Sequence, residues 1–491
     1  MTICNGIARS LALASLGCTL AGCVMGPNFV KPKPKVPAQW SPTAAANGTE
    51  GASHVTSQGA QTVAWWSSFN DPTLSSLVQQ SASQNLDVKE AMLRIEEAQE
   101  QIAVVAGGLW PDVSANASWS RQRLSTNTPN GAIFGLHFPN LPPTLVNPYD
   151  QYQLGLGASW TLDLFGTERR SLEAAGAQMQ AAVEGAHAAL LSMVSDVAAT
   201  YIDLRGAQAR RSILERSLAT QRDLLQLTRD RRNAGLTSDL DVQNATAEVG
   251  TTQAEVPLAD RQITVDINEL SELMARPPEA LRAELEQAQP VPAVPPVVPI
   301  GLPLDLARRR PDVRQAEANL HAATAEIGIA IANYFPQLTL TAAGGFQSEG
   351  LSQLVETASR FASLGPAIQL PIFEGGRLHA EVRLQKVKAK EAAVEYAQTV
   401  LTALHQVEDA LAAYGADQAR LASLQTAVTA SRNARQLARQ RYQSGVASFI
   451  DVLDAERTEE GNELSLADAT TAVSGDLVQL YRALGGGWAS R

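Results

Sequence analysis

Cysteine is nearly absent from this chain of 491 residues: it has three, and all of them lie within the first 23 positions. Cys23 ends the tetrapeptide Leu-Ala-Gly-Cys, which follows a short apolar run with Arg9 on its N-terminal side. The run is too short to cross a bilayer and has the layout of a secretory signal. We therefore expect 1–22 to be a signal peptide, and the single cysteine that remains excludes a disulfide framework.

Basic residues, aromatic residues and long apolar runs are also scarce. The 39 lysines and arginines are outnumbered by 50 acidic residues, which argues against nucleic acid as a partner. Aromatic residues make up only 5% of the chain, which favours helices packed through small side chains. After Cys23 no apolar run reaches about 18 residues, so a membrane-spanning helix is excluded.

The motifs of common enzymes are missing as well. The sequence has no Gly-x-Ser-x-Gly elbow, no phosphate-binding Gly-Lys-Ser/Thr loop and no His-Glu-x-x-His metal pair. His405 and Glu408 lie one helical turn apart, which is typical of a solvated surface pair. We therefore expect no enzyme activity, no cofactor and no metal.

Proline is missing from two long stretches, 167–234 and 376–444. At a rise of 1.5 Å per residue, each stretch predicts a helix of about 100 Å. Each is followed by a short turn with a glycine that suits a left-handed helix end and a serine that suits the next N-cap. We predict two long helical hairpins that pack by coiled-coil rules, at 167–275 and 376–485.

The chain also repeats itself. The shift that places Asp87 on Asp312 places Trp110 on Phe335, and a second shift aligns the two turns. Between the copies lies a proline-rich stretch that cannot be helical. We predict a lipidated N-terminal tether at 23–66, a first repeat at 67–289, a linker at 290–303 and a second repeat at 304–491.

Alternation of apolar with small polar residues marks four segments, at 111–121, 151–164, 337–346 and 364–373. In the second segment every other residue from Tyr152 to Leu164 is apolar, and the opposite face is mainly Gly, Ser, Thr and Gln. This pattern is typical of a strand in a lipid-facing barrel. One sheet of a soluble sandwich is the alternative.

Four strands are too few to close a barrel in a membrane, because the smallest outer-membrane barrels have about eight. An open sheet edge in hydrocarbon leaves N–H and C=O groups unpaired, and each costs several kcal/mol. If the strands enter lipid, several chains must contribute to one barrel. The sequence therefore predicts an oligomer without specifying its order.

Five sequence features resemble one family. The tetrapeptide ending at Cys23 resembles the bacterial lipobox, and four further motifs follow in family order: Met25–Pro32, Arg308–Arg314, Tyr442–Gly445 and Ile450–Arg457. Together they resemble the TolC/OprM-type outer-membrane factors, and within these the NodT-type lipoproteins that serve resistance-nodulation-division (RND) efflux pumps. The resemblance covers essentially the whole chain after Cys23.

The resemblance implies an α+β membrane protein of the outer membrane. A homotrimer would form one twelve-stranded β-barrel, four strands per chain, continued by a long periplasmic α-helical coiled-coil barrel. Cys23 would carry an N-palmitoyl and an S-diacylglycerol group in outer-membrane lipid. The partners would be a periplasmic adaptor (membrane fusion) protein and an inner-membrane RND pump. The function would be that of a passive exit duct for drugs or other toxic small molecules.

The resemblance further implies a periplasmic gate around the second turn. Asp451, Asp454 and Arg457 share a helix face, so copies around a symmetry axis would form charged rings. The alternative is a solvated helix N-terminus, where aspartate is favoured anyway. Val446 and Ala447 stand where the family often has a basic residue, so we expect a looser or differently bonded closure. The gate residues are Tyr442, Ile450, Asp451, Asp454 and Arg457 with Asp241 as cross-partner, and the adaptor-contact helix tips are Gly235, Leu236, Gly445 and Val446.

Two classes of function remain open from the sequence. One is an outer-membrane conduit, either of a tripartite efflux pump or of a polypeptide secretion system, since the pump that selects the cargo is not part of this chain. The other is a lipid-anchored structural coiled-coil protein of the cell surface. Single-channel currents and SDS-resistant oligomers favour the conduit, whereas monomeric rods favour the surface protein.

Overall fold

The computed structural model describes 24–34, 36–41, 53–56, 63–123, 125, 127–128 and 148–486. This part of the chain is mainly helical, with one four-stranded and one two-stranded sheet. It divides into two compact units, each assembled from three stretches of chain. Of the described residues, the first unit takes in those within 1–31, 97–179 and 318–393, and the second takes in those within 32–96, 180–317 and 394–491. The predicted signal peptide and the acylation site Cys23 lie outside the described residues.

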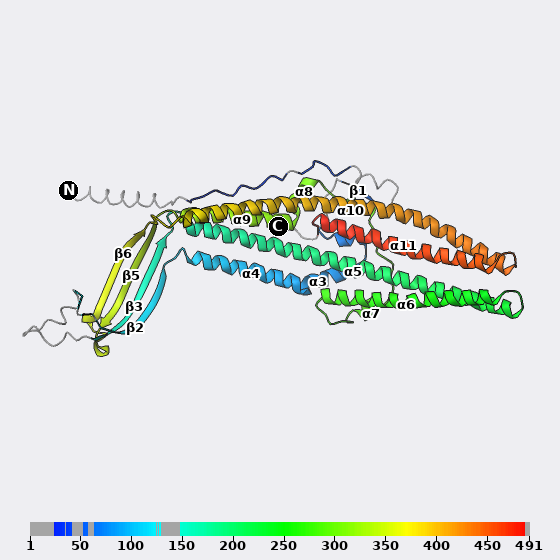
Figure 1. Cartoon of the computed structure of the whole chain (residues 1–491), viewed down its shortest axis with the longest axis horizontal. Coiled ribbons are helices and arrows are strands. Elements are labelled where there is room, and N and C mark those ends of the chain that lie inside the picture. The colour runs from blue at the N-terminus through cyan, green and yellow to red at the C-terminus, as the bar shows by residue number, and fades with distance from the viewer. Residues whose placement is uncertain are drawn as a thin grey trace, which may run out of the picture. The chain divides into compact units, whose positions relative to one another are not determined.

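The four-stranded sheet of the first unit is antiparallel throughout, in the order β2-β3-β5-β6 (Figure 1). Its register brings residues of one parity to one face: Leu156 lies opposite Ala115 on one neighbour and Gly344 on the other. The strands are β2 (Asp112–Gln122), β3 (Tyr149–Leu162), β5 (Gln337–Ser348) and β6 (Arg360–Gln369).

The fourth strand differs from its prediction at 364–373. It begins at Arg360 and ends at Gln369, where its pairing with Gln337 closes the ladder. The alternation of Leu370 and Ile372 extended the prediction too far. The partner strand β5 begins at Gln337, so none of its residues lies opposite Leu370 or Ile372 and the pairing stops at Gln369.

The long helices come in pairs of equal length. The pairs of 22, 67 and 35 residues are α4 (Leu86–Gly107) with α9 (Pro311–Ala332), α5 (Thr167–Asn233) with α10 (Arg377–Gln443), and α6 (Asp239–Leu273) with α11 (Phe449–Ala483). The predicted hairpins at 167–275 and 376–485 agree with these bounds. None of the helices in the described stretches is both long and apolar enough for a membrane crossing.

In the first unit, the chain that follows position 23 is held by Arg170 of α5. This arginine is 2% exposed; its Nε donates to the carbonyl of Met25 at 3.0 Å and its Nη2 to Asn28 Oδ1 at 2.8 Å. Gly328 on α9 leaves the room that Arg170 needs, because a Cβ there would lie 2.8 Å from the arginine side chain. Phe29 stacks on His321 at a centroid distance of 4.4 Å. The segment is therefore fixed by specific contacts.

The second unit contains the main hydrophobic core. Trp65 is fully buried and stacks on Tyr481, with centroids 5.1 Å apart, and the indole N–H of Trp40 donates to the Gly301 carbonyl. Residues 53–56, which we predicted to be part of a tether, instead form a strand that pairs in parallel with the proline-rich linker. The remaining elements of this unit are β1 (His54–Thr56), η1 (Trp65–Phe69), α3 (Pro72–Gln84), α7 (Arg282–Leu285), β4 (Val297–Pro299) and α8 (Pro303–Arg309).

Two short 3-10 helices complete the first unit. They connect β5 to β6 and are η3 (Leu351–Gln353) and η4 (Thr357–Ser359). The two units do not coincide with the predicted repeats, because each unit draws residues from both halves of the sequence. The division at 67–289, 290–303 and 304–491 therefore stays a prediction.

Candidate functional site

One face of the four-stranded sheet is apolar on every strand, which confirms the predicted alternation. Its side chains are largely exposed in the single chain: Leu156 is 62% exposed, Leu364 77% and Ile368 71%. The opposite face carries Gly, Ser, Thr and Gln on the paired strands. An exposed apolar surface of this extent marks a site of contact with an apolar environment. The apolar side chains of this face are Val113, Ala115, Ala117, Trp119, Tyr152, Leu154, Leu156, Ala158, Trp160, Leu162, Leu338, Leu340, Ala342, Phe346, Ala362, Leu364, Pro366 and Ile368, and Ser348 and Arg360 lie at one end of it.

The two outer strands of this sheet have free edges. β2 pairs only with β3, and β6 pairs only with β5, among the strands that the structure describes. An unpaired edge presents a row of N–H and C=O groups to which another strand can bind. The sheet is therefore apolar on one face and has an unpaired edge on each side, among the strands that the structure describes.

The two helical hairpins end in turns of the same construction. In the first, the Gly235 N–H bonds to the Arg232 carbonyl at 2.9 Å and the Leu236 N–H to the Arg231 carbonyl at 2.8 Å. In the second, the corresponding bonds run from Gly445 to Tyr442 and from Val446 to Arg441, both at 2.9 Å. The two glycines have φ values of 75° and 77°, which only glycine adopts without strain.

Each returning helix begins with a capping box. The hydroxyl of Ser448 accepts from the Asp451 N–H, and the Asp451 carboxylate accepts from the N–H and hydroxyl of Ser448, both at 2.8 Å. These hydrogen bonds hold the pKa of Asp451 below its usual value. Asp241 forms the same box with Ser238 and also accepts from Thr237. Within one chain both aspartates therefore cap their own helices.

Tyr442 is buried at the contact between the two hairpins. It is 3% exposed and packs edge-on against Phe449, with ring centroids 6.1 Å apart. The guanidinium of Arg231 lies 4.5 Å from its ring centroid and donates to its backbone carbonyl at 3.1 Å. The surrounding cluster, which consists of Leu224, Leu225, Ala245, Val452 and Leu453, draws on all four hairpin helices together with Tyr442.

The other predicted gate and tip residues face solvent in the single chain. Ile450 is 61% exposed, and Asp454 and Arg457 are exposed on the same helix. Leu236 and Val446, at the two tips, are 66% and 69% exposed. Large apolar side chains at matching places in both turns form a surface suited to a partner.

The comparisons with known proteins decide the family. The sequence model described as outer membrane efflux protein matches 77–276 and 302–486. This chain belongs to the outer membrane efflux protein family. It is 32% identical over 483 residues to nodulation protein T of Rhizobium leguminosarum bv. trifolii, covering 96% of this chain and 95% of that protein.

Two further relatives agree. The chain is 32% identical over 477 residues to the toluene efflux pump outer membrane protein TtgF of Pseudomonas putida, covering 96% of each. The solved structure of the outer-membrane channel OprN superposes with a TM-score of 0.84 at 35% identity, covering 95% of this chain and 100% of that chain. Membership of the outer membrane efflux protein family places this protein in the outer membrane, with a large periplasmic part.

The outer membrane efflux protein family is a family of channels and not an enzyme class. In the described stretches no three His, Cys, Asp or Glu residues are grouped so that they hold a metal ion. Glu408, which we considered beside His405, instead accepts from the N–H and hydroxyl of Ser41 at 2.9 and 2.8 Å. Its role is therefore to fasten the N-terminal segment of the second unit.

The sequence analysis missed two residues at the hairpin ends, Glu248 and Arg231. Glu248 of α6 pairs with Arg457, its Oε2 accepting from the arginine Nε at 2.8 Å, and Arg231 contacts Tyr442 as described. Asp241 was the expected cross-partner, but in one chain it binds Thr237 and Ser238. The available signal for Glu248 was its spacing, because it lies two turns after Asp241 on the same helix.

Proposed function

We propose that three copies of this protein form one outer-membrane channel, the exit duct of a tripartite efflux pump. The three sheets would close a twelve-stranded barrel, and the long helices would continue it as a periplasmic coiled-coil tunnel. The channel would conduct drugs or other toxic small molecules passively. A periplasmic adaptor protein and an inner-membrane RND pump would deliver them.

The observation that carries this proposal is the sheet with one apolar face and two free edges. In lipid, each unpaired backbone group at such an edge costs several kcal/mol. Pairing β6 of one chain with β2 of the next removes this cost and leaves the apolar face outward. Three chains with four strands each would supply twelve strands, which is more than the minimum of about eight for an outer-membrane barrel.

The hairpin ends supply the proposed gate. The rings formed by Asp451, Asp454 and Arg457 of three chains would surround the axis, with Ile450 beside them. Tyr442 and Asp241 would position the hairpin ends without lining the axis, since Tyr442 packs within the hairpin cluster and Asp241 caps α6. The exposed apolar tips would contact the adaptor, at Gly235, Leu236, Gly445 and Val446.

The lipid anchor belongs to the same proposal. Cys23 would be acylated and would anchor the chain in the inner, periplasmic leaflet of the outer membrane. The contacts of Arg170 with Met25 and Asn28 support a fixed place for the start of the mature chain. A Cys23→Ala variant tests this point through loss of palmitate labelling.

The experiment that tests the channel uses the purified, acylated protein. We expect an SDS-resistant oligomer that dissociates on heating, with the mass of three chains, and single-channel currents in planar bilayers. A protein that remains monomeric and leaves liposomes impermeable would contradict the proposal and favour a structural surface protein. Transport of a fluorescent dye by cells with and without the gene then distinguishes small-molecule efflux from polypeptide secretion.

A further inference from the structure

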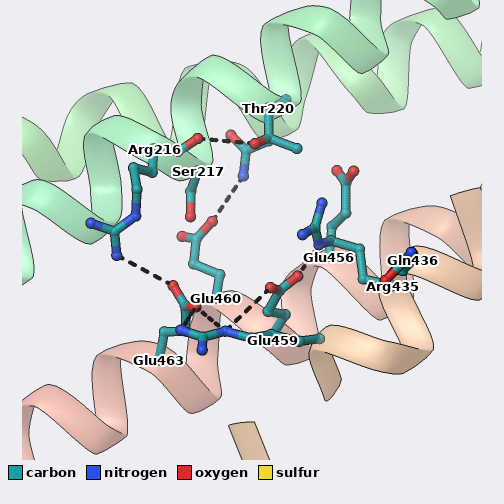
Figure 2. A pocket seen from close by; sticks show the side chains of 11 residues that line it. Arg216, Ser217, Thr220, Arg435, Gln436, Glu456, Glu459, Glu460 and Glu463 are labelled. Carbon is teal, nitrogen blue, oxygen red and sulfur yellow. Dashed lines mark hydrogen bonds and ion pairs between the residues drawn. The ribbon is translucent and has the colours of Figure 1, made fainter. Parts of the chain in front are cut away.

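A polar cavity of about 460 Å³ lies between α5, α10 and α11 of the second unit (Figure 2). It is lined by four glutamates and three arginines, together with neutral polar side chains of α5 and Gln436 of α10. The proposed gate does not use this cavity. The kind of ligand that the cavity suits depends on which of its polar atoms are already paired.

The three arginines are all paired with two of the glutamates. Arg432 donates to Glu463 through Nε at 2.8 Å, and Arg216 lies 3.7 Å from the same carboxylate. Arg435 pairs with Glu459. The positive charge of the lining is therefore already used, and the cavity does not suit an anion.

Two acceptors in the same cavity are unpaired. Glu456 on α11 is 6% exposed, and neither of its carboxylate oxygens has a hydrogen-bond partner in the described part of the protein. Gln221 on α5 is 5% exposed; its Nε2 donates to Glu460 at 2.9 Å, which leaves its Oε1 as an acceptor with no donor among the described groups. Figure 2 shows the Glu456 carboxylate apart from the ion pairs. Buried acceptors without a donor are costly, so a ligand that donates to these two groups would relieve that cost.

We propose that this cavity binds a primary alkylammonium ion. Such an ion brings one positive charge and three N–H donors, which match the carboxylate of Glu456 and the amide oxygen of Gln221. The stems of the paired arginines offer apolar surface for the alkyl chain. The bound ion links α11 to α5 within one chain, and this site does not depend on the proposed channel function.

A bare metal ion fits the cavity less well. Metal–oxygen distances are about 2.0 to 2.6 Å, so an ion that contacts several ligands needs far less space than this cavity provides. The described residues also contain no metal-holding group of three His, Cys, Asp or Glu side chains. The size and the acceptors together favour an organic cation with N–H donors.

Proton binding competes with the ammonium ion at Glu456. Burial raises the pKa of this carboxyl to about 7, against the nearby arginines 435 and 439, which lower it. Because the ammonium ion binds the ionised carboxylate, its affinity should fall as the pH drops below about 7. The charged groups that face Glu456 or line the cavity with it are Arg216 on α5, Glu248 on α6, Arg432, Arg435 and Arg439 on α10, and Glu459, Glu460 and Glu463 on α11.

The test is calorimetric titration of the purified full-length oligomer with n-butylammonium at pH 8. We expect saturable binding that weakens at pH 5.5. In Glu456→Gln binding should be at least about tenfold weaker, as for the loss of a hydrogen bond between charged groups. Glu395→Gln, which removes an exposed carboxylate from α10, should bind like the unmodified protein.

Tetramethylammonium has the same charge as butylammonium and no N–H group, so it shows whether binding needs the N–H donors or only the positive charge. We expect it to show no saturable binding. Gln221→Met gives a second variant, with weaker butylammonium binding, in case Glu456→Gln does not assemble. Undiminished binding in both variants, equal binding of tetramethylammonium or Mg²⁺, or no binding to the unmodified protein would each overturn the proposal.

Discussion

Two buried charged side chains show how differently this protein accommodates charge. Arg170 is 2% exposed and donates to Met25, Asn28 and Glu173, so its charge is fully hydrogen-bonded. Glu456 is 6% exposed, and its carboxylate has no donor in the described part of the chain. The first side chain stabilises a contact, whereas the second makes folding depend on pH.

Replacing Gly328 with alanine should weaken the N-terminal contact. The new Cβ would lie 2.8 Å from Cγ, Cδ and Nε of Arg170, a side chain that is 2% exposed and held by hydrogen bonds to Met25 and Asn28. We expect a loss of about 1–3 kcal/mol of unfolding free energy, as for overpacking. Limited proteolysis should then cut within 24–34. Gly176→Ala is the control, because nothing lies within 4 Å of its Cβ and alanine should stabilise that helix by about 0.5–1 kcal/mol.

Glu456 should make stability fall as pH rises. Its pKa is raised from 4.5 to about 7 by burial, so its favourable contribution is complete below pH 4.5 and is lost as pH rises through 7. The shift corresponds to roughly 3 kcal/mol. In amine-free buffer, Glu456→Gln should match the unmodified protein near pH 4 and be more stable at pH 8. The stability of the variant should still fall with pH, but less steeply, because Asp266 and Asp476 also have pKa values raised to about 6.

At the scale of elements, the two hairpins are built to one plan from different side chains. Both turns use a glycine at positive φ and a Ser–Asp capping box. The contacts between the hairpins are not duplicated: Tyr442 and Phe449 belong to the second hairpin, whereas Arg231 and Glu248 belong to the first. The contacts that join the two hairpins therefore come from different side chains on the two sides.

Removing Arg457 should loosen the hairpins at their ends. Arg457→Met leaves Glu248, which is 8% exposed, without its ion pair. Because the arginine is 57% exposed, we expect a cost of only about 1 kcal/mol in stability. In planar bilayers the variant should be open more often than the unmodified channel.

A matched control is Arg420→Met, since Arg420 pairs with Asp417 of its own helix and links no hairpins. Glu248→Gln combined with Arg457→Met should regain the lost stability, because no unpaired buried charge remains, but not the closed level, because the link between the hairpins is still missing. If Arg457→Met and Arg420→Met conduct alike, the link between the hairpins plays no part in closure.

At the scale of the whole molecule, the sheet of one chain is incomplete. Its apolar face is exposed and its outer strands, among those described, each lack one neighbour. In the proposed channel, lipid covers the face and neighbouring chains pair with the edges. Assembly and membrane insertion are therefore expected to depend on each other.

Arginine substitutions on the two faces of β3 should separate lipid contact from water contact. Leu156→Arg places a charge on the apolar face and should cost about 2–4 kcal/mol at the bilayer midplane. Ser159→Arg lies on the opposite face of the same strand and should be tolerated. The readout is the yield of SDS-resistant oligomer in the outer-membrane fraction. Equal yields for the two variants would show that the apolar face does not contact lipid.

The sequence alone predicted the long hairpins, the four strands and the apolar face of the sheet. These features follow from local rules: where proline is missing, where glycine ends a helix, and which parity is apolar. The end of the fourth strand was wrong, because Leu370 and Ile372 continue the alternation beyond Gln369, where the partner strand β5 begins and the pairing stops. Local pattern does not show where a partner strand stops.

Contacts between distant segments were decided only by the tertiary structure. The pairing of Glu248 with Arg457, the hold of Arg170 on the N-terminal segment and the strand at 53–56 each join residues far apart in the sequence. Their partners depend on how helices pack, which no spacing along one helix specifies. The physical reason is that periodicity determines which face of an element is buried, while only packing determines which side chain it meets.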